Sequence, residues 1–295
     1  MCFNFGIEAN ACEPIPDGLS KLLKPGSVIF VGETHGTAQM PESFYDVVCA
    51  ASELGHPVDI ALEFSPDLTA QYQRFLKADQ DAYMDAKDAI LNSDFWTLDI
   101  ERQDGRRSIA AFNLLENLRT LYIANANSNS NSNSNSNSST STNINININI
   151  NININININI NINVFGFDEP VDNLQQRDRK MAEQILTRVG QDNIVLVHTG
   201  RRHSLLEHGT PWDPEVGNTA AYLKEKHSEV ESIRLLHTGG NAWVCKGSCG
   251  VKEIERTASN VEGAALFYKS DGSDKHSWNW NIGAIEASLP QSTKK

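Results

Sequence analysis

The sequence predicts an α/β fold with a mainly parallel central sheet and helices on both faces. Two observations predict this class. Short apolar runs rich in Val, Ile and Phe alternate with longer segments whose apolar residues recur at helical spacing. The apolar runs are nearly continuous, which is typical of parallel strands that are buried on both faces. Short strands that alternate with helices indicate β-α-β units around one sheet.

The first half of the chain is expected to contain two strands and three helices. Residues 26–33, "GSVIFVGE", predict a buried strand. Pro41 is expected to open a helix and Gly55 to end it, because Pro suits a first helical turn and Gly suits the position after the last. The next strand is expected at residues 57–65, "PVDIALEFS". Two helical patterns follow, "PDLTAQYQRFLKAD" and "DGRRSIAAFNLLENLRTLYIA".

The second half continues the alternation. A strand is expected at residues 163–170, "NVFGFDEP", and a helix follows in "NLQQRDRKMAEQILTRVG", closed by Gly190. Further strands are expected at 192–200 and 232–240. The C-terminal part is rich in Trp, Gly and Ser, and we expect it to add edge strands that cover the sheet.

One tract interrupts this order. Residues 125–163 consist of Asn-Ser repeats and then Asn-Ile repeats, without a charged residue. The first half is typical of a flexible polar linker, and the second half alternates with the period of a strand and is prone to cross-β stacking. We interpret the tract as an artificial or corrupted, low-complexity insert. The predicted organisation is therefore an N-terminal tail at 1–25 and a single α/β domain at 26–295 that the insert interrupts.

Charge and hydropathy exclude two classes of protein. The 295 residues carry a formal net charge of −12, whereas nucleic-acid binding needs clustered Lys and Arg. No segment approaches the roughly 20 apolar residues of a transmembrane helix. We therefore expect no nucleic-acid partner and no transmembrane segment.

Five cysteines suggest an oxidising compartment. The simplest arrangement is two small disulfide loops, Cys2–Cys12 and Cys245–Cys249, with Cys49 left free inside a helix. Such a pattern predicts an extracytoplasmic location, periplasmic or secreted. Zinc is the rival interpretation, but a structural zinc site usually pairs two Cys-x-x-Cys units and this chain has a single C-x3-C.

Acids and histidines gather where the predicted strands end. In open α/β sheets, ligands bind in the crevice outside the carboxyl ends of the strands. Four strands would therefore direct such side chains toward one rim. The residues concerned are Glu33 and His35 after the first strand, Glu63 after the second, Asp168 after the third, and His198 with Arg201, Arg202 and His203 after the fourth.

These residue types suit proton transfer or metal binding. Histidine takes and gives protons near neutral pH, or binds a metal through a neutral nitrogen. Carboxylates orient an imidazole, activate water or supply oxygen ligands. Arg201 or Arg202 could stabilise an oxyanion as it forms. No Gly-x-Ser-x-Gly elbow occurs, so water is the expected nucleophile.

Several polar residues also have an ordinary explanation. Asp168 before Glu-Pro could cap a turn, and Arg177 with Asp178 could form a solvated pair on a helix. His237 follows a strand, but "HTGG" is typical of a turn. The remaining histidines are expected to cap or to hydrogen-bond locally: His56, His208, His227 and His276.

Two short motifs, "VGETH" and "GRRH", resemble the paired Gly-x-x-His motifs of the ChaN-like and TIKI/TraB superfamily, to which erythromycin esterases are more distantly related. "ALEFSP" resembles that family's second strand with its acid, and "DGRRSIAAFNLLENLR" and "RDRKMAEQI" resemble its inter-strand helices. "GGNAWVC" followed by "CGV" resembles the tail of bacterial members of unassigned function. Their order along the chain carries the resemblance, because each motif alone is short. The tract at 125–163 departs from the family, in which the corresponding connection is short.

The resemblance implies a ChaN- and erythromycin-esterase-like sheet whose active rim holds both motifs. Glu33 and His35 would then come from the first motif, Glu63 from the second strand and His203 from the second motif. Some relatives are metal-dependent peptidases, others hydrolyse a macrolide ester with a histidine that activates water, and ChaN is associated with haem binding and iron uptake. Because proteins with all of these activities share the fold, the fold alone does not show which activity this chain has.

Two hypotheses about function follow. The first is a hydrolase of an ester or peptide bond in a small molecule or a peptide, with the catalytic residues Glu33, His35, Glu63, His203, Arg201 and Arg202. A divalent metal is its candidate cofactor, with the ligands His35, Glu63 and His203 and, as secondary candidates, His198 and Asp168. The second hypothesis is a haem- or metal-binding protein without turnover. A decayed site that survives as a structural relic is a third alternative.

Overall fold

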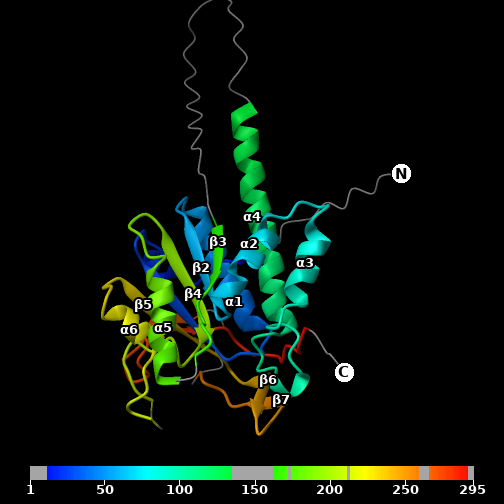
Figure 1. The fold of residues 1–295 in the computed structure, drawn as a ribbon. Helices are drawn as coiled ribbons and strands as arrows, with labels where there is room; N and C mark the ends of the chain where they lie inside the picture. The colour runs from blue at the N-terminus through cyan, green and yellow to red at the C-terminus, as the bar shows by residue number, and fades with distance from the viewer. Residues whose placement is uncertain (1–11, 135–161, 172–173, 211–212, 259–265, 292–295) are drawn as a thin grey trace, which may run out of the picture.

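The computed structural model describes residues 12–134, 162–171, 174–210, 213–258 and 266–291. Its centre is a seven-stranded sheet with the strand order β3-β2-β4-β1-β5-β9-β8 (Figure 1). The strands are β1 (Val28–Glu33), β2 (Val58–Leu62), β3 (Ile162–Gly166), β4 (Ile194–Gly200), β5 (Val230–Leu236), β8 (Leu266–Lys269) and β9 (Trp278–Asn281).

The register of the sheet aligns the carboxyl ends of its strands. In β1, Glu33 lies opposite Gly200 of β4, and Gly32 lies opposite both Thr199 of β4 and Arg234 of β5. The pairs β2–β3, β2–β4 and β5–β9 are also parallel, and only the edge pair β8–β9 is antiparallel among the described strands of this sheet. The predicted, mainly parallel sheet is confirmed, and so is the C-terminal addition of edge strands.

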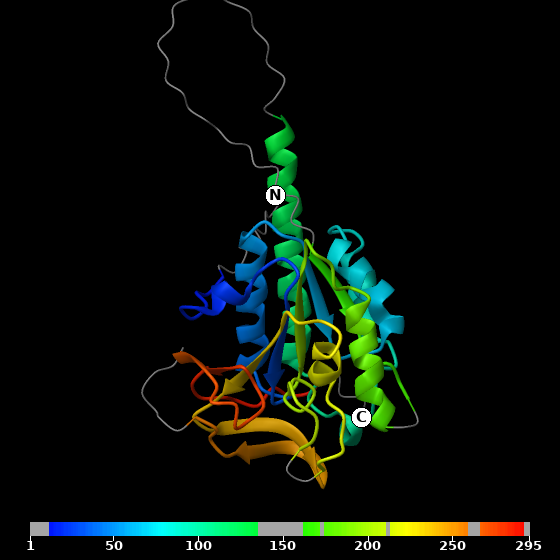
Figure 2. The ribbon, with the colours of Figure 1, turned by 90° about the vertical axis from the view of Figure 1, so that its left-hand side faces the viewer.

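Helices cover both faces of the sheet, as the sequence predicts (Figure 2). Alternate residues of β1 belong to opposite faces: Ile29 and Val31 pack into one core cluster, and Val28 and Phe30 into the other. The first cluster includes side chains of α1 (Gln39–Glu53), α2 (Thr69–Lys77), α3 (Tyr83–Leu91) and α4 (Ile109–Ser134), and the second includes those of α5 (Leu174–Leu186) and α6 (Thr219–Lys224). Short 3-10 helices lie at Leu19–Leu22, Pro66–Leu68 and Ile100–Arg102. Among the described helices, none is long and apolar enough to cross a membrane.

The low-complexity tract begins differently from the prediction. Helix α4 continues to Ser134, so the first ten residues of the expected flexible linker are helical and extend beyond the body of the domain (Figure 1). A helix that packing has already nucleated gains one hydrogen bond for each residue it adds, which explains how the helix runs past its packed part. At the other end of the tract, Ile162 is buried in the first position of β3. Residues 135–161, which include most of the Asn-Ile repeat, lie outside the described residues.

A separate hairpin stands next to the loop that follows β1. Its strands are β6 (Gly240–Lys246) and β7 (Ser248–Ile254), paired antiparallel. Gly36 has a φ of 78°, and a Cβ there would lie 2.1 Å from the carbonyl oxygen of Trp243. Trp243 in turn donates from its backbone N–H to the Gly36 carbonyl at 2.9 Å. Only glycine permits both this backbone conformation and this close approach, so the hairpin fixes the course of the chain just after His35.

Two cysteine pairs are joined by disulfides, and one differs from the expected arrangement. Cys245 pairs with Cys249 as expected, but Cys12 pairs with Cys49. The expectation of a free Cys49 is therefore wrong, and Cys2 lies outside the described residues. Cys49 lies on the buried face of α1, where the N-terminal segment passes it; distance along the chain gives no sign of this contact. Two disulfides are compatible with the predicted extracytoplasmic location.

The Cys12–Cys49 disulfide should stabilise the fold by restricting the unfolded chain. Its partners are separated by 37 positions in the sequence, and closing a loop of this size typically contributes about 2 to 4 kcal/mol. We expect Cys12→Ala to lower the free energy of unfolding by that amount in urea denaturation. The matched control is Cys245→Ala, whose pair spans only 4 positions and should contribute less. Equal losses in both variants would contradict this account of the Cys12–Cys49 bond.

Candidate active site

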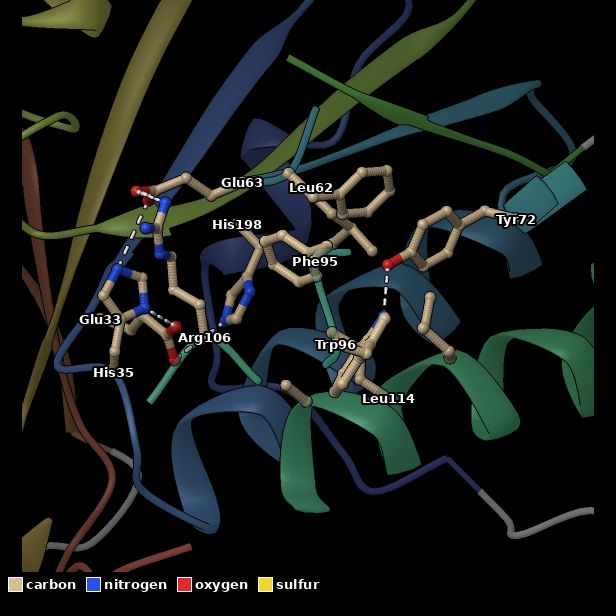
Figure 3. Close-up of a pocket in the computed structure, with 13 residues that line it drawn as sticks. Glu33, His35, Leu62, Glu63, Tyr72, Phe95, Trp96, Arg106, Leu114 and His198 are labelled. Carbon is tan, nitrogen blue, oxygen red and sulfur yellow. Dashed lines mark hydrogen bonds and ion pairs between the residues drawn. The ribbon is translucent and has the colours of Figure 1, made fainter. Parts of the chain in front are cut away.

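Acidic and imidazole side chains from several strand ends meet at one edge of the sheet (Figure 3). Glu33 is the last residue of β1, Glu63 directly follows β2, and His198 lies near the end of β4. All three side chains are buried, and His35 beside them is partly exposed. Parallel pairing of β1, β2 and β4 accounts for this convergence, because it brings their carboxyl ends to the same edge.

The carboxylate of Glu63 is the centre of the cluster. Its Oε2 accepts hydrogen bonds from the Thr199 hydroxyl at 2.7 Å and from the Gly200 backbone N–H at 2.8 Å. Its Oε1 accepts from Arg106 Nη1 at 3.3 Å and from Arg177 Nη2 at 3.2 Å. A buried carboxylate is tolerated only when it is paired and hydrogen-bonded, and these four donors meet that requirement.

Two imidazoles approach Glu63 from different parts of the chain. His35 Nε2 is 3.5 Å from Glu63 Oε2, and His203 Nε2 is 3.7 Å from Glu63 Oε1. The other nitrogen of each ring lies against a second carboxylate: His35 Nδ1 is 2.6 Å from Glu33 Oε1, and His203 Nδ1 is 2.6 Å from Asp178 Oδ1. Each outer carboxylate thus fixes the orientation of its ring, so that both Nε2 atoms face the same side chain.

The pKa values of Glu33 and His35 move apart because the two groups form an ion pair. Burial alone would raise the pKa of Glu33, but His198 and His35 lower it to about 2. Burial alone would lower the pKa of His35, but Glu63 and Glu33 raise it to about 10. His198 Nε2 lies 3.1 Å from Glu33 Oε2. At neutral pH, His35 is therefore a cation between two ionised carboxylates.

The pKa of Glu63 is well below its usual range. Burial opposes this shift, and His203, His35 and Arg106 together outweigh it. The acid is therefore ionised at neutral pH, and its lone pairs are largely occupied by the four donors. This arrangement suits a group that orients the imidazoles better than one that takes up a proton.

Asp178 is a buried part of the site, which corrects the sequence interpretation of Arg177 and Asp178 as a solvated helix pair. Asp178 is 1% exposed, and its Oδ1 also accepts from the backbone N–H of Thr219 at 3.0 Å and from its hydroxyl at 2.8 Å. Its Oδ2 accepts from Arg202 Nη2 at 2.9 Å. The charge at this position faces inward because α5 packs against the sheet with Asp178 turned toward His203.

Asp168 holds the two arginines that reach Glu63. It accepts from Arg177 Nε at 2.7 Å and Nη2 at 2.7 Å, and from Arg106 Nη1 at 2.8 Å. Asp104 binds the opposite side of the Arg106 guanidinium, through Nη2 at 2.6 Å. Bidentate contacts of this kind fix a guanidinium in place, so Asp168 acts on the site through Arg106 and Arg177.

The structure separates the two arginines that the sequence singled out. Arg202 pairs with Asp178 and also donates to the Gly217 carbonyl at 3.2 Å. The Arg201 side chain forms no hydrogen bond or ion pair with any described residue. Partial burial and the nearby charge of Arg234 of β5 lower its pKa. Neither arginine contacts Glu63. Arg106 and Arg177 take that place, and sequence reasoning missed Arg106 because it lies in a loop between helices rather than at a strand end.

The donor set does not fit a divalent metal. Within the described parts of the chain, no three His, Cys, Asp or Glu side chains are arranged to hold a metal ion. The chemistry explains why the proposed ligands His35, Glu63 and His203 fall short: Arg106 and Arg177 already place two positive charges on Glu63. A third cation beside a protonated His35 would be repelled.

A small pocket opens beside the cluster (Figure 3). Its volume of about 40 Å³ has room for roughly three water molecules at about 10 to 15 Å³ each. One wall is polar, and is formed by Glu33, His35, Glu63, Arg106 and His198. The other wall is apolar and aromatic, and is formed by Leu62, Phe64, Tyr72, Phe95, Trp96, Ala111, Leu114 and Leu115. Water bound here would lie against the acids and imidazoles and would be shielded on its other side.

Several solved structures are similar to this chain. A Bacillus cereus protein has a TM-score of 0.58 and 10% identity, and the likeness covers 94% of this chain and 93% of that one. The haem-binding ChaN of Campylobacter jejuni has a TM-score of 0.40 and 12% identity over 74% of this chain and 84% of its own. A mutant of the erythromycin esterase EreC in its open conformation has a TM-score of 0.39 and 9% identity over 81% and 78%.

These likenesses concern the fold alone. The solved structures that resemble this chain include a ChaN and an erythromycin esterase, the two proteins that the sequence resemblance named. No protein-family model matches the sequence. No protein of curated function has a significantly similar sequence either.

The raised pKa of His35 predicts a pH-dependent contribution to stability. A folded pKa of about 10 against the usual 6.5 means that the contribution is fully present below pH 6.5 and is lost as the pH rises toward 10. The difference in free energy of unfolding between the wild type and His35→Gln should therefore shrink between pH 6 and pH 10 in urea titrations. His208→Gln is the matched control, because His208 is an exposed histidine paired with Glu225. A His35→Gln difference that stays constant over this range would contradict the assignment.

Proposed function

We propose that this protein is a hydrolase of an ester or peptide bond, in which the histidine–carboxylate cluster activates water. One observation carries the proposal. Two imidazoles, each held by its own carboxylate, direct Nε2 toward the same ionised Glu63, and Glu63 and His35 line a pocket with room for water. A structural ion pair requires one partner for each charge, whereas this arrangement orients two proton-transfer groups toward one carboxylate.

His203 is the proposed general base. Asp178 accepts a hydrogen bond from Nδ1–H, so that Nε2 carries the lone pair that would accept a proton from water. Arg202 Nη2 lies 3.3 Å from this Nε2, and the water would take its place there. As the ring becomes an imidazolium, the negative charge of Asp178 stabilises it. Asp178 is in turn held by Thr219 and Arg202, so the orientation of the base does not depend on one contact.

His35 has the complementary role. Its raised pKa keeps the ring protonated at neutral pH, so it suits a proton donor to the leaving group better than a base. Arg106 lines the pocket and carries a permanent charge. We assign to it the stabilisation of the developing oxyanion that the sequence suggested for Arg201 or Arg202. Glu63 is a positioning residue, which holds His35, His203 and Arg106 in register.

The pocket indicates how a substrate would bind. It admits only a few atoms, so an uncharged group next to the scissile bond would lie against the apolar wall and the scissile bond itself against the polar wall. Haem binding remains the alternative prediction from the sequence. A haem titration separates the two: a saturable Soret shift without hydrolysis of any substrate would favour the binding protein.

Replacement of the proposed base tests the mechanism. We expect His203→Gln and Asp178→Asn each to lower kcat by about 100- to 10,000-fold, the usual contribution of general acid–base catalysis, in a screen of ester and peptide substrates. His227→Gln serves as a matched control, because His227 binds the Gly26 carbonyl at the opposite, amino-terminal end of β1. Circular dichroism establishes that the variants are folded. Full turnover in a folded His203→Gln variant would overturn the mechanism.

A glycine next to the cluster provides a second test. A Cβ on Gly200 would lie 2.8 Å from His35 Nε2, whereas a Cβ on Gly250 would meet no atom within 4 Å. Gly200→Ala should therefore displace the His35 ring and lower kcat by about 100-fold, as misplacement of a catalytic group by about 1 Å does. Gly250→Ala should leave it unchanged. Equal activity in both variants would show that the position of His35 does not matter to turnover.

A further inference from the structure

A second cluster of charge lies on the other side of β1 from Glu63. Arg201 follows β4, and Arg234 lies within β5. Gly32 of β1 is directly opposite Arg234 in parallel register, so the two positions share a face of the sheet. A Cβ on Gly32 would lie 3.3 Å from the Cα of Arg201. Arg201 and Arg234 therefore lie close together above Gly32. His237 is the residue that directly follows β5.

Three side chains in this cluster carry donors without an acceptor among the described residues. His237 is 1% exposed, and its Nε2 has no hydrogen-bond partner among the described residues. Its Nδ1 accepts from the Gly239 backbone N–H at 3.3 Å, so a neutral ring carries its proton on Nε2 and offers a donor there. Arg234 Nε is also buried without a described acceptor. The Arg201 guanidinium, as stated above, pairs with no described side chain.

The charges in this cluster do not balance. Asp274 is the carboxylate that pairs with Arg234, through Nη1 at 2.9 Å, and no second acid pairs with Arg201 in the described chain. The pKa of His237 is lowered by burial and then by Arg201 and Arg234, so that the ring is a neutral donor in positive surroundings. Buried donors without acceptors are costly and rare in native proteins. Two of them next to an unpaired guanidinium would be satisfied together by an anionic acceptor.

We infer that Arg201, Arg234 and His237 form a binding site for an anionic group, a carboxylate or a phosphate. Guanidinium groups recognise both through charge-assisted hydrogen bonds, and the His237 N–H supplies a further donor. Arg201 is exposed, so an anion would enter from solvent and be held between its guanidinium and the two buried donors.

The position of this site bears on the substrate. The backbone N–H of Arg201 donates to the Glu33 carbonyl at 2.9 Å, so the anion site is one residue away from Gly200 at the reactive rim. If the protein is the hydrolase proposed above, its substrate would carry an anionic group on this side of the scissile bond. That last step rests on the proposed function, whereas anion binding itself does not.

A titration with inorganic phosphate tests the site without any turnover. The signals of His237 Nε2–H and Arg234 Nε–H are followed by NMR at constant ionic strength, with chloride as the balancing ion, and the titration is repeated with acetate. We expect a saturable shift of both signals. Arg201→Gln should weaken binding by at least roughly tenfold, the usual effect of losing one charge-assisted hydrogen bond. Arg74→Gln, at an exposed arginine on α2, should bind like the wild type.

Each outcome is informative. Saturation by phosphate alone assigns a phosphate-bearing ligand, and saturation by acetate as well assigns carboxylates. Shifts that grow linearly with either anion, or binding that Arg201→Gln leaves unchanged, would overturn the site. Phosphate binding in a protein that hydrolyses nothing would contradict the proposed function and leave the anion site standing.

Discussion

The ionised carboxylate of Glu63 is the constraint on which the rest of the site depends. A buried charge must be neutralised and hydrogen-bonded, or the group takes up a proton instead. Here Thr199 and Gly200 supply the hydrogen bonds, and Arg106 and Arg177 supply the positive charge. Once these donors hold the carboxylate, its negative charge attracts further cations. The two imidazoles that turn Nε2 toward it come from the loop after β1 and from the turn after β4.

The fold satisfies this constraint with few local features. Parallel strands bring β1, β2 and β4 to one edge, and each then delivers its polar residue at the same level. Gly200 leaves room for the His35 ring, and Gly36 lets the chain turn away beneath the β6–β7 hairpin. Helix α5 supplies the remaining charges, Arg177 and Asp178, from the opposite side of the sheet. The rim is thus built from the ends of rigid strands and the residues that directly follow them, together with α5 and the loop that carries Arg106.

The sequence predicted the sheet and the strand ends well, because both depend on local patterns. Apolar runs predict buried strands, and a parallel sheet necessarily places their ends together, which is how Glu33, Glu63 and His198 come to be neighbours. Contacts between distant segments were not predictable in this way. Arg106 lies in a loop, where no repeating pattern predicts its position. A charged residue in a helix normally faces solvent, and only the packing of α5 shows that Asp178 faces His203. The Cys12–Cys49 pair was missed for the same reason.

The charge of Glu63 should affect the imidazoles of both His35 and His203. NMR titration of the two imidazoles in the wild type and in Glu63→Gln tests it most directly. The account predicts that the wild-type His35 titrates near pH 10, that Glu63→Gln lowers this pKa, and that the ring signals of both histidines shift in the variant. A wild-type His35 that titrates near the ordinary pKa of 6.5 would contradict this role of Glu63. Ring signals of both histidines that stay unchanged in Glu63→Gln would contradict it as well.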